Sequence, residues 1–270
     1  MRPAAVITGA SAGIGAELAR VFAASGHDLV LVARREQRLR ELAEEIAASG
    51  RPKPQVVAID LARRDAGNEL GRALAAGGCE PQYIVNNAGF GLIGHAAELD
   101  RAPQLEIVDL NARTLLDLSL AFVDSLARHR GGILNVASVA GVMPGPGSAV
   151  YYASKAFALS FSEALHQELK PLGVRVTCLC PGPVPTEFQR RAGIGESAPN
   201  RLIDVPAAKV AKAGYRGLMR GKRVVVPGLL PKLLFALVPR IVPKNVLLEQ
   251  LEARQAARRA GLQPVSPLEP

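Results

Sequence analysis

The chain has 270 residues, 49% of them hydrophobic, and a formal net charge of +9. These values predict one α/β domain with a large core, although length alone also allows two small domains. Aromatic residues make up only 4% and do not interleave with basic residues, so we expect no nucleic-acid binding. The three cysteines offer no disulfide framework, and the first apolar run begins too early for a signal peptide, so we expect a cytoplasmic protein.

Short apolar runs recur along the chain and predict strands. They are nearly continuous and rich in β-branched residues, which is typical of strands buried on both faces of a parallel sheet. The runs are 4–8, 28–33, 55–59, 83–86, 133–137, 174–179 and 224–227. Helical patterns alternate with them, and longer helices are expected over 102–129 and 150–171. The alternation predicts a single doubly wound Rossmann domain with a seven-stranded, mainly parallel sheet and helices on both faces.

A glycine-rich turn follows the first predicted strand. Residues 8–15 read TGASAGIG and lead into a helical pattern. Glycine allows a sharp turn close to a pyrophosphate, and the helix N-terminus offers free N–H groups to the anion. The spacing differs from the general dinucleotide fingerprint, so plain turn glycines are the alternative. The candidate nucleotide contacts are Gly9, Ser11, Gly13, Ile14 and Gly15.

The residues after the second strand bear on the choice of cofactor. An NAD site usually places an acidic residue about 20 residues beyond the glycines, where it holds the ribose 2′-hydroxyl. Here the strand ends with Arg34 and Arg35, and arginine binds a 2′-phosphate through paired N–H groups. We therefore predict that Arg34 selects NADP(H). A ribose contact by Glu36 keeps NAD(H) possible, and a solvated Arg34 in a helix first turn is the plain alternative.

A tyrosine and a lysine lie at helical spacing in the segment 150–171. Tyr151 and Lys155 are four residues apart, so they share one helix face with Cβ atoms about 5–6 Å apart. The ammonium is expected to favour the phenolate and to bring the phenol closer to a useful acid–base strength. Tyr152 is excluded as the partner because Ala156 stands four residues beyond it.

Together these motifs resemble the short-chain dehydrogenase/reductase family, in particular the branch that reduces ketones, 3-oxoacyl groups or steroids. Each motif alone is weak, but they follow the family's order and spacing across about residues 4–190. The matching segments are the turn at 8–15, Asp60-Leu61, NNAG at 86–89, Asn111, Ser138, Tyr151-x3-Lys155 and PGPVPT at 181–186.

The resemblance implies a role for each catalytic residue. Tyr151 would donate the proton, and Ser138 would hydrogen-bond the carbonyl oxygen. Lys155 would also hold the nicotinamide ribose, and Asn111 would anchor a water that feeds protons to Lys155. An asparagine in a helix is often only a local hydrogen bonder, and Ser138 also suits a turn.

Further cofactor contacts follow from the same resemblance. Asp60 would contact the adenine, and it also suits the N-cap of a following helix. The backbone of Asn86, Ala88 and Gly89 would run beside the adenosine ribose. Val184 and Thr186, in the segment after the sixth strand, would meet the nicotinamide carboxamide. The cofactor contacts expected in this segment are Pro181, Gly182, Val184 and Thr186.

The predicted partner is a small hydrophobic carbonyl or alcohol, because apolar residues flank the catalytic strand ends. These residues are Phe90, Leu92, Ile93, Val139, Val142, Met143 and Phe188. Two alternatives stay open: a 3-oxoacyl thioester reductase, and a catalytically silent NADP(H) sensor or scaffold. No metal site is expected, because the histidines lack metal spacing and Cys178 and Cys180 suit buried core thiols. From the family we expect a homodimer or homotetramer.

The domain limits follow from these patterns. Residues 1–228 would form the NADP(H)-binding and catalytic domain, with a lid at about 187–200. Residues 229–260 would be a basic, apolar C-terminal extension of the same domain, and 261–270 a loose tail.

The extension is the least family-typical part of the chain. Pro231, Pro239 and Pro243 forbid one long helix, and interspersed Lys and Arg argue against a membrane span. We expect the protein itself to bury its leucines, over the substrate mouth or in a subunit contact. Peripheral contact with an anionic membrane is the alternative.

Overall fold

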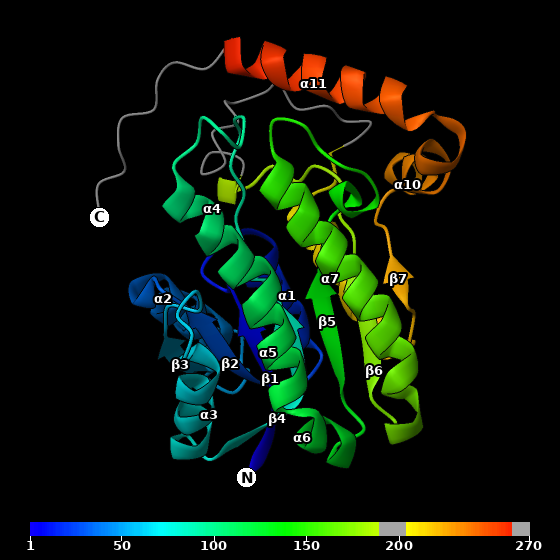
Figure 1. The fold of residues 1–270 in the computed structure, drawn as a ribbon. Helices are drawn as coiled ribbons and strands as arrows, with labels where there is room; N and C mark the ends of the chain where they lie inside the picture. Colours follow the sequence, from blue (N-terminus) through cyan, green and yellow to red (C-terminus); the bar gives the residue numbers. More distant parts are fainter. Residues whose placement is uncertain (189–203, 261–270) are drawn as a thin grey trace.

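The computed structural model describes residues 1–188 and 204–260. Within them, seven strands form one sheet in the order β3-β2-β1-β4-β5-β6-β7 (Figure 1). Every neighbouring pair is parallel, so the predicted Rossmann architecture is confirmed with a sheet that is wholly parallel. The strands are β1 (Arg2–Thr8), β2 (Asp28–Ala33), β3 (Gln55–Ala58), β4 (Cys79–Asn86), β5 (Gly132–Val136), β6 (Arg175–Leu179) and β7 (Val224–Val225).

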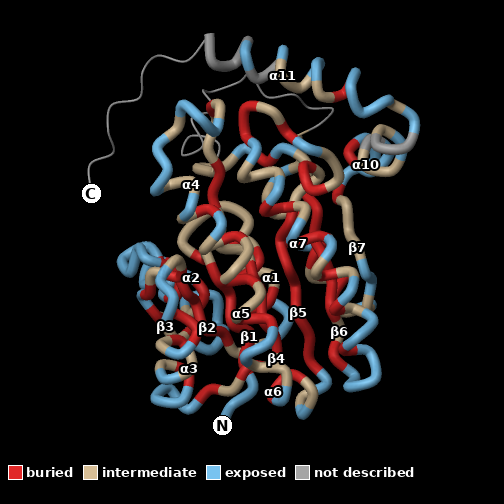
Figure 2. The backbone as a smooth tube through the Cα atoms, in the orientation of Figure 1, coloured by how far each residue is buried: buried red, intermediate tan, exposed pale blue. Residues whose placement is uncertain are grey.

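Helices cover both faces of the sheet. One face packs against α1 (Gly13–Ala24), α2 (Glu36–Ala48) and α9 (Ala207–Met219). The other packs against α3 (Ala66–Ala76), α5 (Leu115–Ala121), α6 (Val123–Arg128) and α7 (Ala149–Glu168). Side chains of a strand alternate between the two cores: Ile7 of β1 joins the first, and Val6 the second. Figure 2 shows the strands buried along most of their length, which explains their continuous apolar sequences.

The helix expected over 102–129 is interrupted, so that prediction is wrong in detail. It consists of α4 (Arg101–Val108), a π-helical turn η1 (Asp109–Thr114), α5 and, after Phe122, α6. Single π-helical turns are frequent at functional sites, and this one carries Asn111. The helix expected over 150–171 ends earlier, at Glu168. A 3₁₀ turn η3 (Lys170–Leu172) follows it, because Pro171 has no N–H to continue an α-helix.

The strand order reverses between β1 and β4. From β1 the chain first adds β2 and β3 on one side and then β4 on the other. The chain after β1 leads to α1 on one face of the sheet, and the chain after β4 leads to helices on the other face, so a crevice is expected at the carboxyl edge between them. Such a switch point is where doubly wound sheets bind their ligands.

The C-terminal extension forms two helices, α10 (Leu229–Ile241) and α11 (Lys244–Ala260), separated at Val242 and Pro243. The prediction that no single long helix forms is confirmed at Pro243, whereas Pro231 and Pro239 lie within α10. In Figure 1, α11 runs across the end of the molecule where the strands have their carboxyl ends. It is held there by buried Leu247 and by Glu252, which lies 3.4 Å from the His95 ring.

Only part of the apolar surface of α10 is covered by the rest of the chain. Phe235 packs against the core around Leu159. Another face carries a stripe four residues apart along the helix, and its members are between 48% and 77% exposed: Leu229, Leu233, Leu237 and Ile241. The rest of the chain therefore does not bury this stripe over the substrate mouth, and its burial in a subunit contact stays a prediction. None of the helices in the described ranges is long and apolar enough to cross a membrane. The predicted lid beyond Phe188 and the tail 261–270 lie outside the described residues.

Candidate active site at the switch point

The glycine loop after β1 is built for close approach. Gly9 has φ +65°, in the left-handed region that favours glycine. A Cβ at Gly15 would lie 2.2 Å from the carbonyl oxygen of Gly9, so no larger residue fits there. Helix α1 begins at Gly13 without a side-chain cap, so backbone N–H groups are left at its N-terminus for an anion. The loop therefore has the backbone geometry that suits a phosphate, and the contacts expected of Gly9, Ser11, Gly13, Ile14 and Gly15 stay predictions.

Hydrogen bonds tie this loop to the end of β4. Thr8 Oγ1 accepts the N–H groups of Asn87 and Ala88 at 2.9 and 3.0 Å. The Asn87 side chain donates to the carbonyl oxygens of Thr8 and Gly9 at 2.9 and 3.3 Å. The sequence analysis includes Asn87 in the NNAG motif but assigns it no role. A side chain that hydrogen-bonds to a neighbouring strand produces no recognisable spacing pattern in the sequence.

The side chain of Asn86 has a different environment. Its amide donates to Asn135 Oδ1 at 2.9 Å and to Ser119 Oγ at 3.0 Å, and the residue is buried between the sheet and α5. Only its backbone is therefore placed for the nucleotide contact expected of it.

The predicted catalytic residues converge beside this crevice. Ser138 follows β5 and caps a 3₁₀ turn η2 (Val139–Val142), and its hydroxyl is hydrogen-bonded to Tyr151. Lys155 Nζ lies 5.8 Å from the centre of the Tyr151 ring, and it donates to the Val136 carbonyl at 2.9 Å. Ser138 and two residues of α7 thus meet in one cluster, and Tyr151 and Lys155 share one helix face as their spacing predicts.

Burial dominates the electrostatics of this cluster. It raises the pKa of Tyr151 to about 12, against the opposing hydrogen bond with Ser138. It also lowers the pKa of Lys155 to about 8. The pKa of Tyr151 is therefore not lowered as the sequence analysis expects, because desolvation by burial is the largest influence on the phenol.

Asn111 holds the loop after β4 against α7. Its side chain accepts from the Phe90 N–H at 3.2 Å and donates to the Phe90 carbonyl at 2.9 Å and to Ser154 Oγ at 3.1 Å. A Cβ at Gly89 would lie 2.8 Å from Asn111 Oδ1 and 3.5 Å from Lys155 Nζ, so both side chains approach this glycine. Asn111 is thus both the local hydrogen bonder and a neighbour of Lys155, and its role in proton supply stays a prediction.

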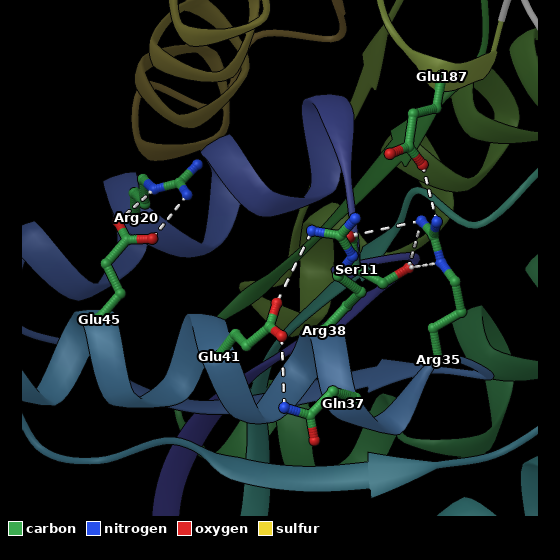
Figure 3. Close-up of polar contacts among 8 residues, drawn as sticks. All are labelled: Ser11, Arg20, Arg35, Gln37, Arg38, Glu41, Glu45 and Glu187. Atoms are coloured by element: carbon green, nitrogen blue, oxygen red, sulfur yellow. Dashed lines mark hydrogen bonds and ion pairs between the residues drawn. The ribbon is translucent and has the colours of Figure 1, made fainter.

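The two arginines after β2 point to different partners. Arg34 Nη1 lies 3.5 Å from Glu106 Oε1 and 4.0 Å from Asp60 Oδ2. Arg35 instead donates to Ser11 Oγ, from Nε at 3.3 Å and from Nη2 at 3.1 Å (Figure 3). Arg35 and not Arg34, the arginine that the sequence singles out, therefore touches the glycine loop, and the role of Arg34 stays a prediction.

The remaining predicted contacts border the same crevice. Asp60 Oδ1 accepts the N–H of Ala62 at 3.1 Å and so caps the turn after β3. In the segment after β6, the Pro181 carbonyl accepts the N–H of Val139 at 3.0 Å. The segment continues through Gly182 and buried Val184 to Thr186, whose methyl group would lie 3.2 Å from a Cβ at Gly13.

A small hollow of about 10 Å³, which has room for about one water molecule, adjoins Tyr151. Its lining includes Leu92, Leu99, Ile107, Val150, Gln104 and Ser148. The Phe188 ring lies over Tyr151 with its centroid at 5.6 Å. Cys178 and Cys180 are buried core thiols, as predicted, with their sulfur atoms 3.6 Å apart. No cluster of three or more potential metal ligands occurs in the ranges 1–188 and 204–260.

The chain is similar to known proteins of one family. Residues 3–197 match the family model for short chain dehydrogenase. Sulfoacetaldehyde reductase from Chromohalobacter salexigens is 39% identical over 210 residues, which cover 76% of this chain and 82% of that protein. The NADP-dependent 3-hydroxy acid dehydrogenase of Escherichia coli is 35% identical over 186 residues, or 68% and 73% of the two chains. A short-chain dehydrogenase from Sphingobium yanoikuyae, solved with NADPH, is 28% identical, with a TM-score of 0.76 and 99% of both chains covered.

The chain therefore belongs to the short-chain dehydrogenase family. It is an oxidoreductase that interconverts CH–OH and C=O groups with a nicotinamide cofactor.

The buried lysine predicts a pH-dependent stability difference. The pKa of Lys155 is about 8 in the folded protein and 10.5 for an ordinary lysine, as in the unfolded chain. Between these pH values the unfolded chain binds more protons, so the stability of the fold rises with pH. Lys155→Met should be more stable than wild type by about 3 kcal/mol below pH 8, and the difference should vanish towards pH 10.5. Urea unfolding across this range measures it. A difference independent of pH contradicts the assignment.

Proposed function

We propose that the protein is an NADP(H)-dependent reductase of hydrophobic carbonyl compounds, with Tyr151 as the proton donor. The observation that carries this proposal is the cluster of Tyr151, Ser138 and Lys155 beside the glycine loop. A phenol whose pKa is raised to about 12 stays protonated throughout the physiological range, which is the form needed for reduction.

The protein's own residues would act on the carbonyl oxygen. The hydroxyl of Ser138, already bonded to Tyr151, would hydrogen-bond that oxygen and orient it. As negative charge develops there, Tyr151 would transfer its proton to it, since an alkoxide is a stronger base than a phenolate. The Lys155 ammonium would stabilise the phenolate that remains and hold the nicotinamide ribose. Bound NADPH would supply the hydride.

The crevice fits a dinucleotide. Its pyrophosphate would lie against Gly9, Gly15 and the start of α1, where the backbone leaves no room for a Cβ. The basic residues after β2, Arg34 and Arg35, would hold a 2′-phosphate, in keeping with the names of two of the compared proteins. Asp60 would face the adenine. The backbone of Asn86, Ala88 and Gly89 would border its ribose, and Val184 and Thr186 would meet the carboxamide.

The apolar side chains beside Tyr151, which include Leu92 and the Phe188 ring, support a hydrophobic substrate. The experiment that tests the function is NADPH consumption with a panel of ketones, aldehydes, sugars and 3-oxoacyl thioesters on free, coenzyme A and carrier-protein forms. Fastest turnover on hydrophobic ketones supports the proposal. Activity confined to the thioesters replaces it with the 3-oxoacyl reductase, and tight NADPH binding without turnover on any compound replaces it with the silent sensor.

The proton donor is tested by removing one oxygen. Tyr151→Phe should lower kcat by about 100-fold or more and leave NADPH affinity unchanged, because only the acid is lost. Tyr152→Phe is the matched control, since it removes the neighbouring phenol from the same helix. Steady-state kinetics and NADPH fluorescence titration measure both variants. Turnover of Tyr151→Phe near that of wild type would remove this residue from the mechanism.

The cofactor choice is tested at the arginines. Arg35→Gln should weaken NADPH binding by about tenfold or more and leave NADH binding unchanged, because a charged hydrogen bond to the 2′-phosphate is lost. We expect the same direction for Arg34→Gln. Arg38→Gln, next along α2 and paired with Glu41, should change neither. Equal efficiency of wild type with NADH and NADPH would show that neither arginine selects the cofactor.

The exposed leucine stripe of α10 supports a subunit contact, since an apolar stripe of this length rarely faces water in a monomer. We expect wild type to be a homodimer or homotetramer and the double variant Leu233→Ser, Leu237→Ser to be smaller, as measured by light scattering after gel filtration. A monomeric wild type that co-sediments with phosphatidylglycerol vesicles, and loses them in high salt, would instead assign the stripe to a membrane surface.

A further inference from the structure

Arg35 is shared between two parts of the molecule. While its Nε and Nη2 donate to Ser11 in the glycine loop, its Nη1 donates to Glu187 Oε2 at 2.8 Å (Figure 3). Glu187 lies eight residues beyond the end of β6. The guanidinium proposed to hold a 2′-phosphate is thus also bound to a carboxylate of its own chain.

A carboxylate and a phosphate compete for the same guanidinium donors. The side chains of Arg35 and Glu187 are 45% and 35% exposed, so their ion pair is weak enough to exchange. A phosphate bound at Arg35 must either displace Glu187 or lie beside a like charge, and both lower its affinity. A cofactor with a 2′-hydroxyl meets neither penalty.

The next residue along the chain lies on the proton donor. The Phe188 ring is inclined at 50° to that of Tyr151, with 5.6 Å between the centroids. Adjacent Cα atoms are about 3.8 Å apart, so a displacement of Glu187 is passed to Phe188. Two successive residues therefore contact the arginine of the phosphate subsite and the ring of the catalytic tyrosine.

We propose that Glu187 is a specificity-determining residue that competes with the 2′-phosphate for Arg35, and that its release from Arg35 shifts Phe188 on the Tyr151 ring. This inference rests on the proposed use of NADP(H) and adds a residue that restrains it. It links occupation of the phosphate subsite to the surroundings of Tyr151, so that the cofactor prepares the site before the carbonyl binds.

The competition is measured with nucleotides that lack the nicotinamide. Calorimetric titration compares adenosine 2′,5′-bisphosphate with adenosine 5′-monophosphate. Glu187→Gln should bind the bisphosphate about three- to tenfold more tightly than wild type does, with unchanged affinity for the monophosphate. The gain should shrink in high salt and disappear when Arg35→Gln is added, because the pair is then already broken.

The matched control is Glu41→Gln. It also removes one carboxylate paired with an arginine of α2, in the same region of the surface (Figure 3). An equal gain in Glu41→Gln would reduce the effect to net charge and overturn the proposal, as would no gain in Glu187→Gln. If wild type binds the bisphosphate no better than the monophosphate, both this inference and the proposed NADP(H) preference fail. A preference in wild type that Glu187→Gln leaves unchanged refutes the inference alone.

The link to Tyr151 has its own readout. The chain contains no tryptophan, so Phe188→Trp introduces a unique fluorophore beside Tyr151. Its emission should change on addition of the bisphosphate, stay constant with the monophosphate, and respond much less in the Glu187→Gln background. Emission that is indifferent to bound bisphosphate, or that responds equally to both nucleotides, would refute the link.

Discussion

The clasp between Thr8 and Asn87 is the constraint on which the site depends. In a parallel doubly wound sheet the loops after β1 and β4 separate at the switch point, and that separation opens the crevice. The Thr8 hydroxyl and the Asn87 amide bridge the two strand ends with four hydrogen bonds, so the crevice has a fixed floor. This packing also requires glycine at positions 9 and 15. A Cβ at Gly9 or Gly15 would clash with the joined loops, and only without it can the backbone closely approach a nucleotide.

The cluster around Tyr151 and Lys155 differs from this clasp, because the burial of these two groups lowers the stability of the fold. Lys155 is only 5% exposed, and its hydrogen bond to the Val136 carbonyl offsets only part of the cost of burial, as its lowered pKa shows. Burial raises the pKa of Tyr151 in the same environment. Both pKa shifts favour the neutral forms of Tyr151 and Lys155. A negative charge that develops near Tyr151 would therefore be stabilised by the Lys155 ammonium. A site poised in this way stabilises a transition state more than a resting state.

Much of this architecture is predictable from sequence, and the rest is not, for physical reasons. Continuous β-branched runs locate the strands because both faces of the sheet are buried, and the spacing of Tyr151 and Lys155 survives because helix geometry is regular. The direction of the Tyr151 pKa shift was mispredicted because desolvation depends on the whole fold. Local spacing does not distinguish Arg34 from Arg35, because the partners of both side chains are distant in sequence. Those of Arg34 lie 26 or more residues away, and those of Arg35 lie 24 or more residues away. The exposure of the α10 stripe likewise depends on what packs beside it.

The segment from Pro181 to Phe188 connects these parts. Its first carbonyl accepts the N–H of Val139 in the turn that Ser138 caps, and Thr186 lies against Gly13 at the start of α1. Its last two residues contact Arg35 and Tyr151. One stretch of chain therefore touches the turn that Ser138 caps, the start of α1, Arg35 after β2 and the Tyr151 ring. These contacts all belong to one short stretch of chain, so a ligand that alters one of them changes the conformations open to the others. The proposed coupling between cofactor and substrate therefore needs no larger movement of the sheet.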